Sequence, residues 1–186
     1  MTRSIMLVCR ANLCRSPTAE VMLRVALAGT PVDADVSSSG LEAVTGQLAP
    51  PEFIDEALVR GIDLRDRVPV AFSRADARAA DLIVTMTRDL LRAAVVDTPS
   101  LWPRSFTLLE LVRRGVSLEP PEPDDTLEGW LARVHASRDR AELLGTDPID
   151  DIRDPIATAA EGSAAMFDQI EQSTKRLARL LCVLSG

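Results

Sequence analysis

The stretch VCRANLCRSPTAE, residues 8–20, decides the fold, because an apolar run, SIMLVC (4–9), leads directly into it. A short apolar run of this kind is typical of a buried parallel strand. Ser16 and Pro17 predict the start of a helix, since serine caps helices and proline suits the first helical position. The stretch therefore predicts a strand, a short loop and a helix. In α/β sheets, ligands bind at such a turn, where backbone N–H groups point at an anion.

Strands and helices alternate along the rest of the chain. Further strands are predicted at 32–40 and 82–86, and a short fourth strand merges into a helix within 105–115. The other helices are predicted at 17–28, 50–62, 87–95, 126–145 and 162–184. This order predicts an α/β fold, a four-stranded parallel sheet with helices on both faces in a Rossmann-like three-layer arrangement. The length suits one domain over residues 1–186.

The composition disfavours several classes of protein. The net charge of −7, from 28 acidic and 21 basic residues, disfavours nucleic acid as a partner. No apolar stretch approaches the roughly 20 residues of a membrane span, and the first residues lack a signal peptide pattern. Three cysteines are too few for a disulfide scaffold, so a reducing cytoplasm is expected. One histidine leaves little material for a Ser–His–Asp triad or a histidine-rich zinc site.

The loop between Cys9 and Arg15 has the chemistry of phosphoryl transfer. It is long enough to wrap one tetrahedral oxyanion, and Arg15 would bind two of its oxygens. The same amides and the helix dipole would favour a Cys9 thiolate, which is a nucleophile. The alternative is that Cys9 is a small buried apolar residue at a strand end. The strand before the loop and the helix after it favour the catalytic interpretation.

Residues 9–17, CRANLCRSP, resemble the signature loop C-x-G-N-x-C-R-S-P of the low-molecular-weight protein tyrosine phosphatase family. Further resemblance lies in VSSSG (36–40), in the order from EALVRGIDL to ADLIVTM, and in DIRDPIATAAEG (151–162), which aligns with the family's D-x-x-D-P-Y-Y loop. The pattern covers about 150 residues and leaves 116–147 as an insertion. The resemblance implies a phosphotyrosine protein phosphatase I-like fold. It also implies hydrolysis of phosphate monoesters through a cysteinyl-phosphate, on protein phosphotyrosine.

The resemblance also implies roles for individual residues. Cys9 would be the nucleophile, and Arg15 would bind the phosphate and stabilise the transition state. Asp154 would protonate the leaving oxygen and then activate water. Asn12 would hold the loop in a strained shape, and Ser16 would hydrogen-bond the Cys9 thiolate.

The remaining loop residues, Arg10, Ala11, Leu13 and Cys14, are expected to bind substrate together with Asn12 and Ser16. The expected partner is a phosphorylated protein or a small aryl phosphate, and the protein would be a monomer or a weak dimer. No metal or cofactor is required for this chemistry.

Several supporting residues have competing interpretations. Asp147 also precedes a proline and is the rival of Asp154, although the gapless alignment favours Asp154. Cys14 either fills the underside of the loop or forms a reversible disulfide with Cys9. The other interpretations assign Cys182 to the core and His135 to the surface. Trp130 either packs or lines the pocket, and packing is favoured. Asp150 and Asp151 are assigned to solvent, with the alternative that one of them orients the loop.

The chain departs from the family pattern at positions that shape the loop and the substrate wall. Ala11 replaces the loop glycine. Aromatic residues are expected where Glu42–Gln47 and where Ile156 and Ala157 stand. Asp66 or Arg67 replaces a histidine, and Thr87 replaces a carboxylate.

These departures leave alternatives open. A redox arsenate reductase would need a further cysteine pair, and none lies between residues 15 and 181. A thiol-dependent arsenate reductase with an external reductant remains open. Protein arginine phosphatases carry threonine where Leu13 stands, and the larger leucine favours an aryl phosphate. The last alternative is a catalytically weak regulatory protein that binds phosphate.

Overall fold

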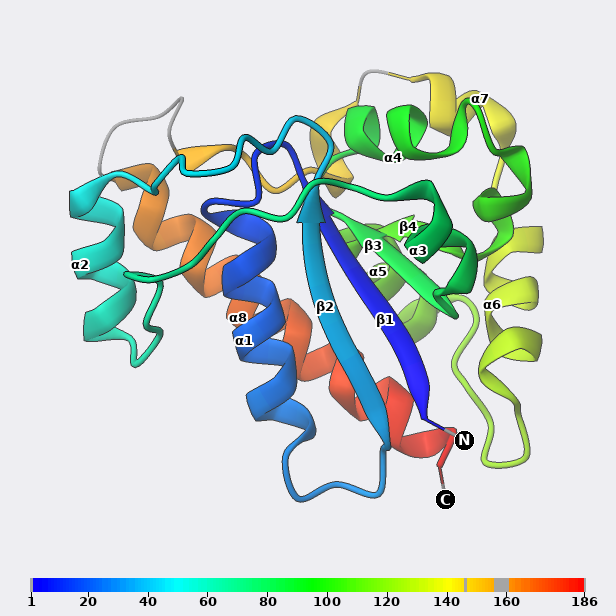
Figure 1. Ribbon diagram of the computed structural model, residues 1–186. Helices are drawn as coiled ribbons and strands as arrows, with labels where there is room; N and C mark the ends of the chain where they lie inside the picture. Colours follow the sequence, from blue (N-terminus) through cyan, green and yellow to red (C-terminus); the bar gives the residue numbers. More distant parts are fainter. Residues whose placement is uncertain (1, 146, 156–160, 186) are drawn as a thin grey trace.

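The computed structural model describes residues 2–145, 147–155 and 161–185. Its centre is a parallel sheet in the order β2-β1-β3-β4 (Figure 1). The strands are β1 (Arg3–Cys9), β2 (Ala34–Gly40), β3 (Leu82–Thr85) and β4 (Ser105–Thr107). The predicted fold class is confirmed, and the predicted strand positions agree closely. Cys9 pairs with Gly40 at the edge where the strands end, so the candidate loop lies at the carboxyl end of the sheet.

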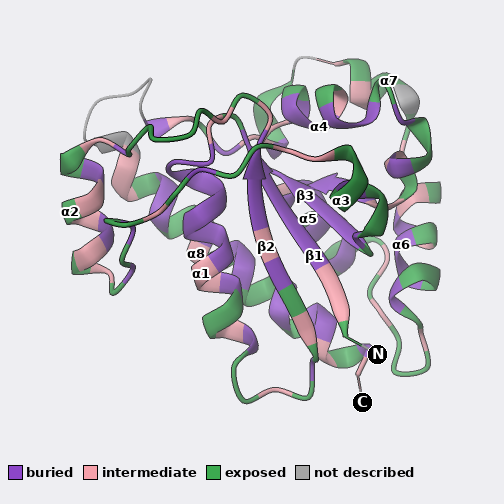
Figure 2. Ribbon diagram, in the orientation of Figure 1, coloured by how far each residue is buried: buried purple, intermediate pink, exposed green. Residues whose placement is uncertain are grey.

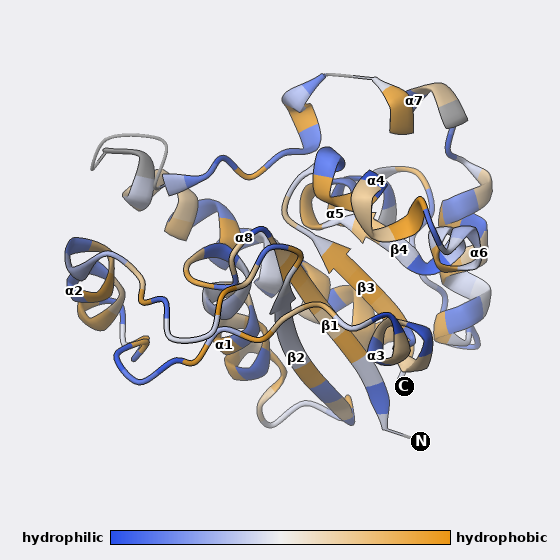
Figure 3. Ribbon diagram, turned by 45° about the horizontal axis from the view of Figure 1, so that its top comes forward, coloured by the Kyte–Doolittle hydropathy of each residue, from blue (hydrophilic) through white to orange (hydrophobic). Residues whose placement is uncertain are grey.

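Helices cover both faces of the sheet. One face of the sheet carries α1 (Arg15–Leu27), α5 (Leu108–Ser117) and α8 (Glu161–Val183), and α2 (Pro51–Val59) packs on α8. The other face carries α3 (Arg74–Ala79), α4 (Arg88–Val95) and the 3-10 helix η1 (Pro99–Arg104). Strand β1 serves both cores, since Leu7 and Cys9 face the first while Met6 and Val8 face the second. The strands are accordingly buried along most of their length (Figure 2), and β1 and β3 are apolar (Figure 3).

The stretch 116–147 contains two helices, α6 (Leu127–Ala136) and α7 (Arg140–Leu144), before the 3-10 turn η2 (Pro148–Asp150). The single helix expected over 126–145 is therefore wrong. It is interrupted because the Ser137 hydroxyl donates to a carbonyl at the end of α6, while Asp139 accepts the Ala141 N–H and starts α7. No helix in the described part of the chain is long and apolar enough to cross a bilayer. That 116–147 is an insertion stays a prediction.

Trp130 anchors α6 in the main core. Its side chain is fully buried, and its indole N–H donates to the Glu119 carbonyl at 2.7 Å. The packing interpretation of Trp130 is confirmed. His135 is half-buried, and its ring meets Trp102 edge-on with centroids 4.9 Å apart, so the expectation of a surface histidine is wrong.

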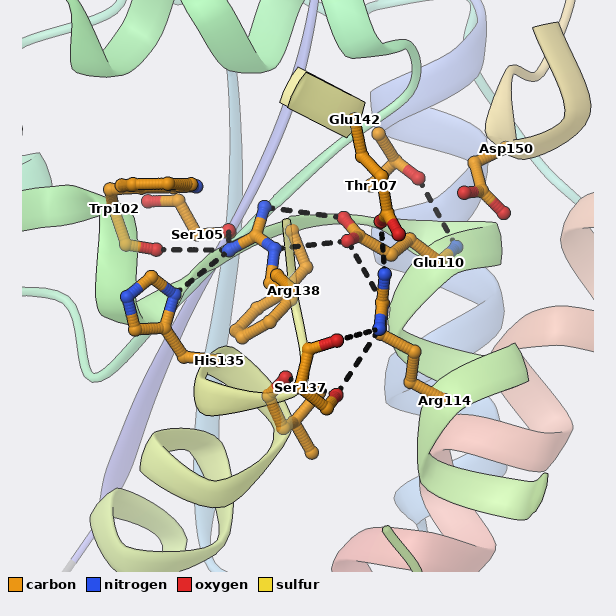
Figure 4. Close-up of polar contacts among 12 residues, drawn as sticks. Trp102, Ser105, Thr107, Glu110, Arg114, His135, Ser137, Arg138, Glu142 and Asp150 are labelled. Carbon is orange, nitrogen blue, oxygen red and sulfur yellow. Dashed lines mark hydrogen bonds and ion pairs between the residues drawn. The ribbon is translucent and has the colours of Figure 1, made fainter. Parts of the chain in front are cut away.

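A buried group of charges attaches α6 and α7 to α5 (Figure 4). The Glu110 carboxylate on α5 contacts two guanidinium groups, Arg138 at 2.9 Å and Arg114 at 3.2 Å. Arg114 also donates to the Ser137 carbonyl at 2.8 Å and pairs with Glu142 of α7. Burial lowers the pKa of Arg138 from its usual value, and the nearby Glu110 opposes this shift. The two helices are thus held by ion pairs as well as by Trp130.

Candidate active site

The Cys9 side chain lies at the floor of the loop that follows β1. Its Sγ atom accepts two hydrogen bonds, from the Asn12 backbone N–H at 3.2 Å and from the Ser16 hydroxyl at 3.0 Å. Cys9 is only 2% exposed. The donors lie on the loop and on the start of α1, so together they fix the sulfur at the floor of the loop.

Asn12 gives the loop its shape. Its φ is 56°, in the left-handed region, and its side chain is fully buried. The amide nitrogen donates to the Ser16 and Ser38 hydroxyls at 3.0 and 2.8 Å, and the amide oxygen accepts the Val70 N–H at 2.8 Å. Among the described residues, Asn12 is the non-glycine residue with positive φ. Ala11, in place of the family's glycine, therefore carries no left-handed strain.

The start of α1 differs from the sequence-based expectation. The helix begins at Arg15, and Cys14 precedes it without making a side-chain cap. Ser16, which was expected to cap the helix, directs its hydroxyl to Cys9 instead. The first N–H groups of a helix have no partner within the helix and carry partial positive charge. Since no side chain caps α1, these donors remain available to an anion in the loop.

The other loop residues contribute backbone rather than side chains. Leu13 and Cys14 are buried in the core, and Ala11 packs against it. None of the hydrogen bonds of the described residues uses the backbone N–H of Ala11 or Leu13. Arg10 is exposed and pairs with Glu42 at 2.6 Å, on the outer side of the loop. The Ala11 and Leu13 N–H groups are therefore not used within the described part of the chain.

Arg15 joins the loop to the distant Asp–Pro segment. Its buried guanidinium donates to the Ile152 carbonyl at 3.1 Å and pairs with the Asp154 carboxylate. Asp147, the rival aspartate, is exposed and accepts the Ile149 N–H at 3.0 Å, which starts the turn η2. Asp154 is thus the one of the two that lies beside the loop. Ile156 and Ala157 lie outside the described residues.

Gly40 lets the end of β2 approach the loop. A Cβ atom at this position would lie 2.7 Å from the Arg10 carbonyl oxygen and from the Asn12 nitrogen. Both atoms belong to the backbone, so neither can turn away. The glycine of VSSSG is therefore required by the close approach of strand and loop.

A second layer of charge supports Asn12 from behind. Arg67 donates to the Ser38 hydroxyl at 2.7 Å and to Glu20 at 2.5 Å. Glu20 is only 3% exposed and also pairs with Arg24 at 2.7 Å. Of the two residues expected in place of the family's histidine, the structure assigns Arg67. Sequence reasoning missed Glu20 and Ser38, although a glutamate within the largely buried first turns of α1 is a signal that could have been read.

The expectation that Asp150 and Asp151 lie in solvent is wrong for Asp150, whereas Asp151 is half-buried. Asp150 is 1% exposed and pairs with Arg88 at 3.0 Å and Arg113 at 2.8 Å. Asp151 accepts the Arg88 backbone N–H at 2.7 Å. Both aspartates therefore fasten the segment that carries Asp154.

Cys14 is a thiol rather than a thiolate at neutral pH. Burial raises its pKa to about 12, with smaller contributions from Cys9 and Asp154, while Arg15 opposes them. All three cysteines are free in the structure. Within the described ranges, no group of three or more His, Cys, Asp or Glu side chains is placed to hold a metal ion.

The family model described as low molecular weight phosphotyrosine protein phosphatase matches residues 4–142. The chain belongs to this family. Membership in the low molecular weight phosphotyrosine protein phosphatases makes the protein a hydrolase of phosphate monoesters. The matched range contains the Cys9 loop and ends before Asp154.

Curated relatives and solved structures agree with this membership. The chain is 32% identical over 111 residues to the probable low molecular weight protein-tyrosine-phosphatase EpsP of Ralstonia solanacearum, covering 60% of this chain and 74% of that protein. It is 35% identical over 109 residues to the probable phosphatase AmsI of Erwinia amylovora, covering 59% and 72%. The structure of a low molecular weight protein tyrosine phosphatase from T. tengcongensis superposes with a TM-score of 0.69 at 22% identity, covering 96% of this chain and 99% of that one. The last likeness supports the fold.

The close approach at Gly40 generates the first prediction. In Gly40→Ala, the new Cβ forces the loop away from β2, and we expect kcat/KM for an aryl phosphate to fall about 100-fold, the cost of displacing reacting groups by roughly 1 Å. Steady-state kinetics and circular dichroism measure activity and fold together. Ser39→Ala is the matched control, because the neighbouring Ser39 hydroxyl has no hydrogen-bond partner. Near wild-type activity in Gly40→Ala would contradict the assigned role.

The buried Cys14 thiol generates a prediction for alkaline pH. Unfolded Cys14 loses its proton near its ordinary pKa of 9.0, whereas folded Cys14 keeps it up to about 12. The unfolded state therefore binds fewer protons in this window, and the free energy of unfolding falls as pH rises, by up to about 1.4 kcal/mol per pH unit. Denaturant titrations with reductant should give Cys14→Ala a shallower decline than wild type. Cys182→Ala, which retains Cys14, should keep the wild-type decline, and equal slopes in all three proteins would refute the prediction.

Proposed function

We propose that the protein removes phosphate from phosphotyrosine through a cysteinyl-phosphate intermediate on Cys9. The observation that carries the proposal is the Cys9 sulfur, which accepts hydrogen bonds from the Asn12 N–H and the Ser16 hydroxyl at the start of α1. A phosphate dianion above the sulfur would meet the uncapped start of α1 and the Arg15 guanidinium. Because the charge is spread over three equatorial oxygens in the transition state, such donors lower the barrier.

The reaction has two steps in this proposal. In the first, the Cys9 thiolate attacks phosphorus, the S–P bond forms and the P–O bond to the leaving group breaks, while Asp154 gives its proton to the leaving oxygen. In the second, Asp154 takes a proton from water, whose oxygen attacks phosphorus and breaks the S–P bond. Inorganic phosphate and the free thiolate result. The closeness of Asp154 to Arg15 supports these roles, because it places the carboxyl group next to the group that would bind phosphate.

The proposed substrate is a phosphorylated protein or a small aryl phosphate, in keeping with the names of the relatives. The chain has two tryptophans, four phenylalanines and no tyrosine. All six rings are buried in or packed against the two cores: Phe53, Phe72, Phe106, Phe167, Trp102 and Trp130. We therefore propose that the site holds its substrate mainly through the phosphate and discriminates weakly between aryl groups. A monomer or weak dimer in the cytoplasm stays a prediction.

The arsenate reductase alternative gains no support. Arg3, at the start of β1, donates to the carbonyls of Leu181 and Leu184, which places Cys182 at that end of the strand. Cys9 stands at the other end of the seven-residue strand, about 20 Å away at 3.3 Å per residue. An exchange between Cys9 and Cys182 is therefore excluded without large rearrangement. Only a variant with an external thiol would remain.

Hydrolysis of phenyl phosphate, measured with reductant and chelator present, tests the assignment of roles. We expect Cys9→Ser to abolish turnover and Asp154→Asn to lower kcat by about 10²- to 10³-fold, the usual contribution of a general acid. Asp147→Asn is the matched control, since asparagine can still accept the Ile149 N–H, and it should retain wild-type rates. Turnover in Cys9→Ser, or a larger loss in Asp147→Asn than in Asp154→Asn, would disprove the proposal.

A further inference from the structure

The segment that leads to Asp154 is held by a carboxylate that the reaction does not use. Asp150 lies four residues before Asp154, at the end of the turn η2, and is 1% exposed. Its Oδ1 atom accepts Arg113 Nε at 3.0 Å, and its Oδ2 atom accepts Arg113 Nη2 at 2.8 Å and Arg88 Nη2 at 3.0 Å. A bidentate arginine fixes both position and orientation of a carboxylate. Asp150 is therefore fastened to two helices at once, α4 through Arg88 and α5 through Arg113.

Hydrogen bonds and ion pairs hold most of the residues from Asp150 to the acid. The Asp151 carboxylate accepts the Arg88 N–H at 2.7 Å, and the Ile152 N–H donates to the Met86 carbonyl at 2.8 Å. The Ile152 carbonyl then accepts Arg15 Nη1 at 3.1 Å, and Asp154 pairs with the same guanidinium. Asp150 and Asp151 are thus bound to α4. Ile152 is bound to Met86, directly after β3, and Asp154 is bound to Arg15. Arg153 is the exception.

The helix α5 carries two adjacent arginines with separate duties. Arg114 belongs to the charged group that holds α6 and α7, and Figure 4 shows it beside Glu110 and Glu142. Arg113 faces the acid-bearing segment instead, and its hydrogen bonds to Asp150 raise the pKa of Arg113. Arg114 binds α7, which precedes the segment 147–155, and Arg113 binds the segment itself through Asp150. Both arginines lie on α5, so α5 helps to fix the position of the segment before it reaches the Cys9 loop.

We propose that Asp150, held by Arg113, is a positioning residue for Asp154. The inference rests on the proposed function, in which Asp154 is the general acid. An acid transfers a proton only within hydrogen-bond reach of the leaving oxygen, and a displacement of about 1 Å costs a large part of the rate. Loss of the Asp150 clamp removes the attachment of this segment to α5 and to the Arg88 side chain, while the Cys9 loop keeps its own hydrogen bonds to Asn12 and Ser16. Proton delivery should fail while nucleophilic attack persists.

Two substrates separate these effects. Phenyl phosphate has a leaving oxygen that needs a proton, whereas 2,4-dinitrophenyl phosphate has one that departs readily as an anion. The readout is the ratio of kcat/KM for the dinitrophenyl ester to kcat/KM for the phenyl ester. We expect Asp150→Asn and Arg113→Ala each to raise this ratio about tenfold, and Asp154→Asn to raise it further. Asp147→Asn, in the same turn but without a cation partner, should leave it unchanged.

Inhibition by inorganic phosphate and circular dichroism verify that loop and fold are intact. Arg113 is the safer site for folding, because its side chain is 42% exposed. An unchanged ratio in Asp154→Asn would overturn the acid role itself, and with it the proposed function. A raised ratio in Asp154→Asn with unchanged ratios in both Asp150→Asn and Arg113→Ala would overturn the positioning role alone. An equal fall for both esters in these two variants would do the same, since it would indicate only structural damage.

Discussion

The side-chain amide of Asn12 holds the loop above Cys9 in a shape that its backbone would not otherwise keep. A left-handed conformation costs a non-glycine residue roughly 1–2 kcal/mol. Three buried hydrogen bonds of about 1 kcal/mol each offset this cost, and they do so only while all three partners stay in place. In this conformation the Asn12 backbone N–H donates to the Cys9 sulfur. The reactivity proposed for Cys9 therefore depends on Ser16, Ser38 and Val70 as much as on the cysteine.

Buried carboxylates organise the rest of the molecule, and three of them share one arrangement. Glu20 contacts Arg24 and Arg67, Asp150 contacts Arg88 and Arg113, and Glu110 contacts Arg114 and Arg138. Removing one partner from a buried pair costs about 3–5 kcal/mol, because a charge is left in a poorly solvated place. The Glu20 group supports the Cys9 loop, the Asp150 group holds the segment before Asp154, and the Glu110 group attaches α6 and α7 to α5. Each of these three carboxylates is thus held by two arginines.

Periodicity in the sequence was sufficient for the sheet and for most helices. The meeting of Asp154 with Cys9 and Arg15 was expected only from the resemblance to the family. The sequence did not predict α3, because a helix of six residues leaves a weak pattern. It also missed the break between α6 and α7, where Ser137 ends one helix and Asp139 starts the next. It named Arg67 only as one of two candidates and without its partner Ser38, and it did not predict that two arginines hold Asp150. An arginine in a loop and an aspartate in an acidic run look solvated until tertiary packing buries them. Residues whose duty depends on distant partners are the ones that sequence reasoning missed.

The mass of the protein during turnover tests most directly whether Cys9 is the nucleophile. Wild-type enzyme would be mixed with a rapidly reacting aryl phosphate and quenched in acid within the first turnovers, and its peptides would then be analysed by mass spectrometry. We expect one added phosphoryl group on the peptide that contains Cys9, located on Cys9 rather than on Cys14, and none in Cys9→Ser. Release of product in a burst without any phosphoryl group on Cys9 would show that Cys9 is not the nucleophile.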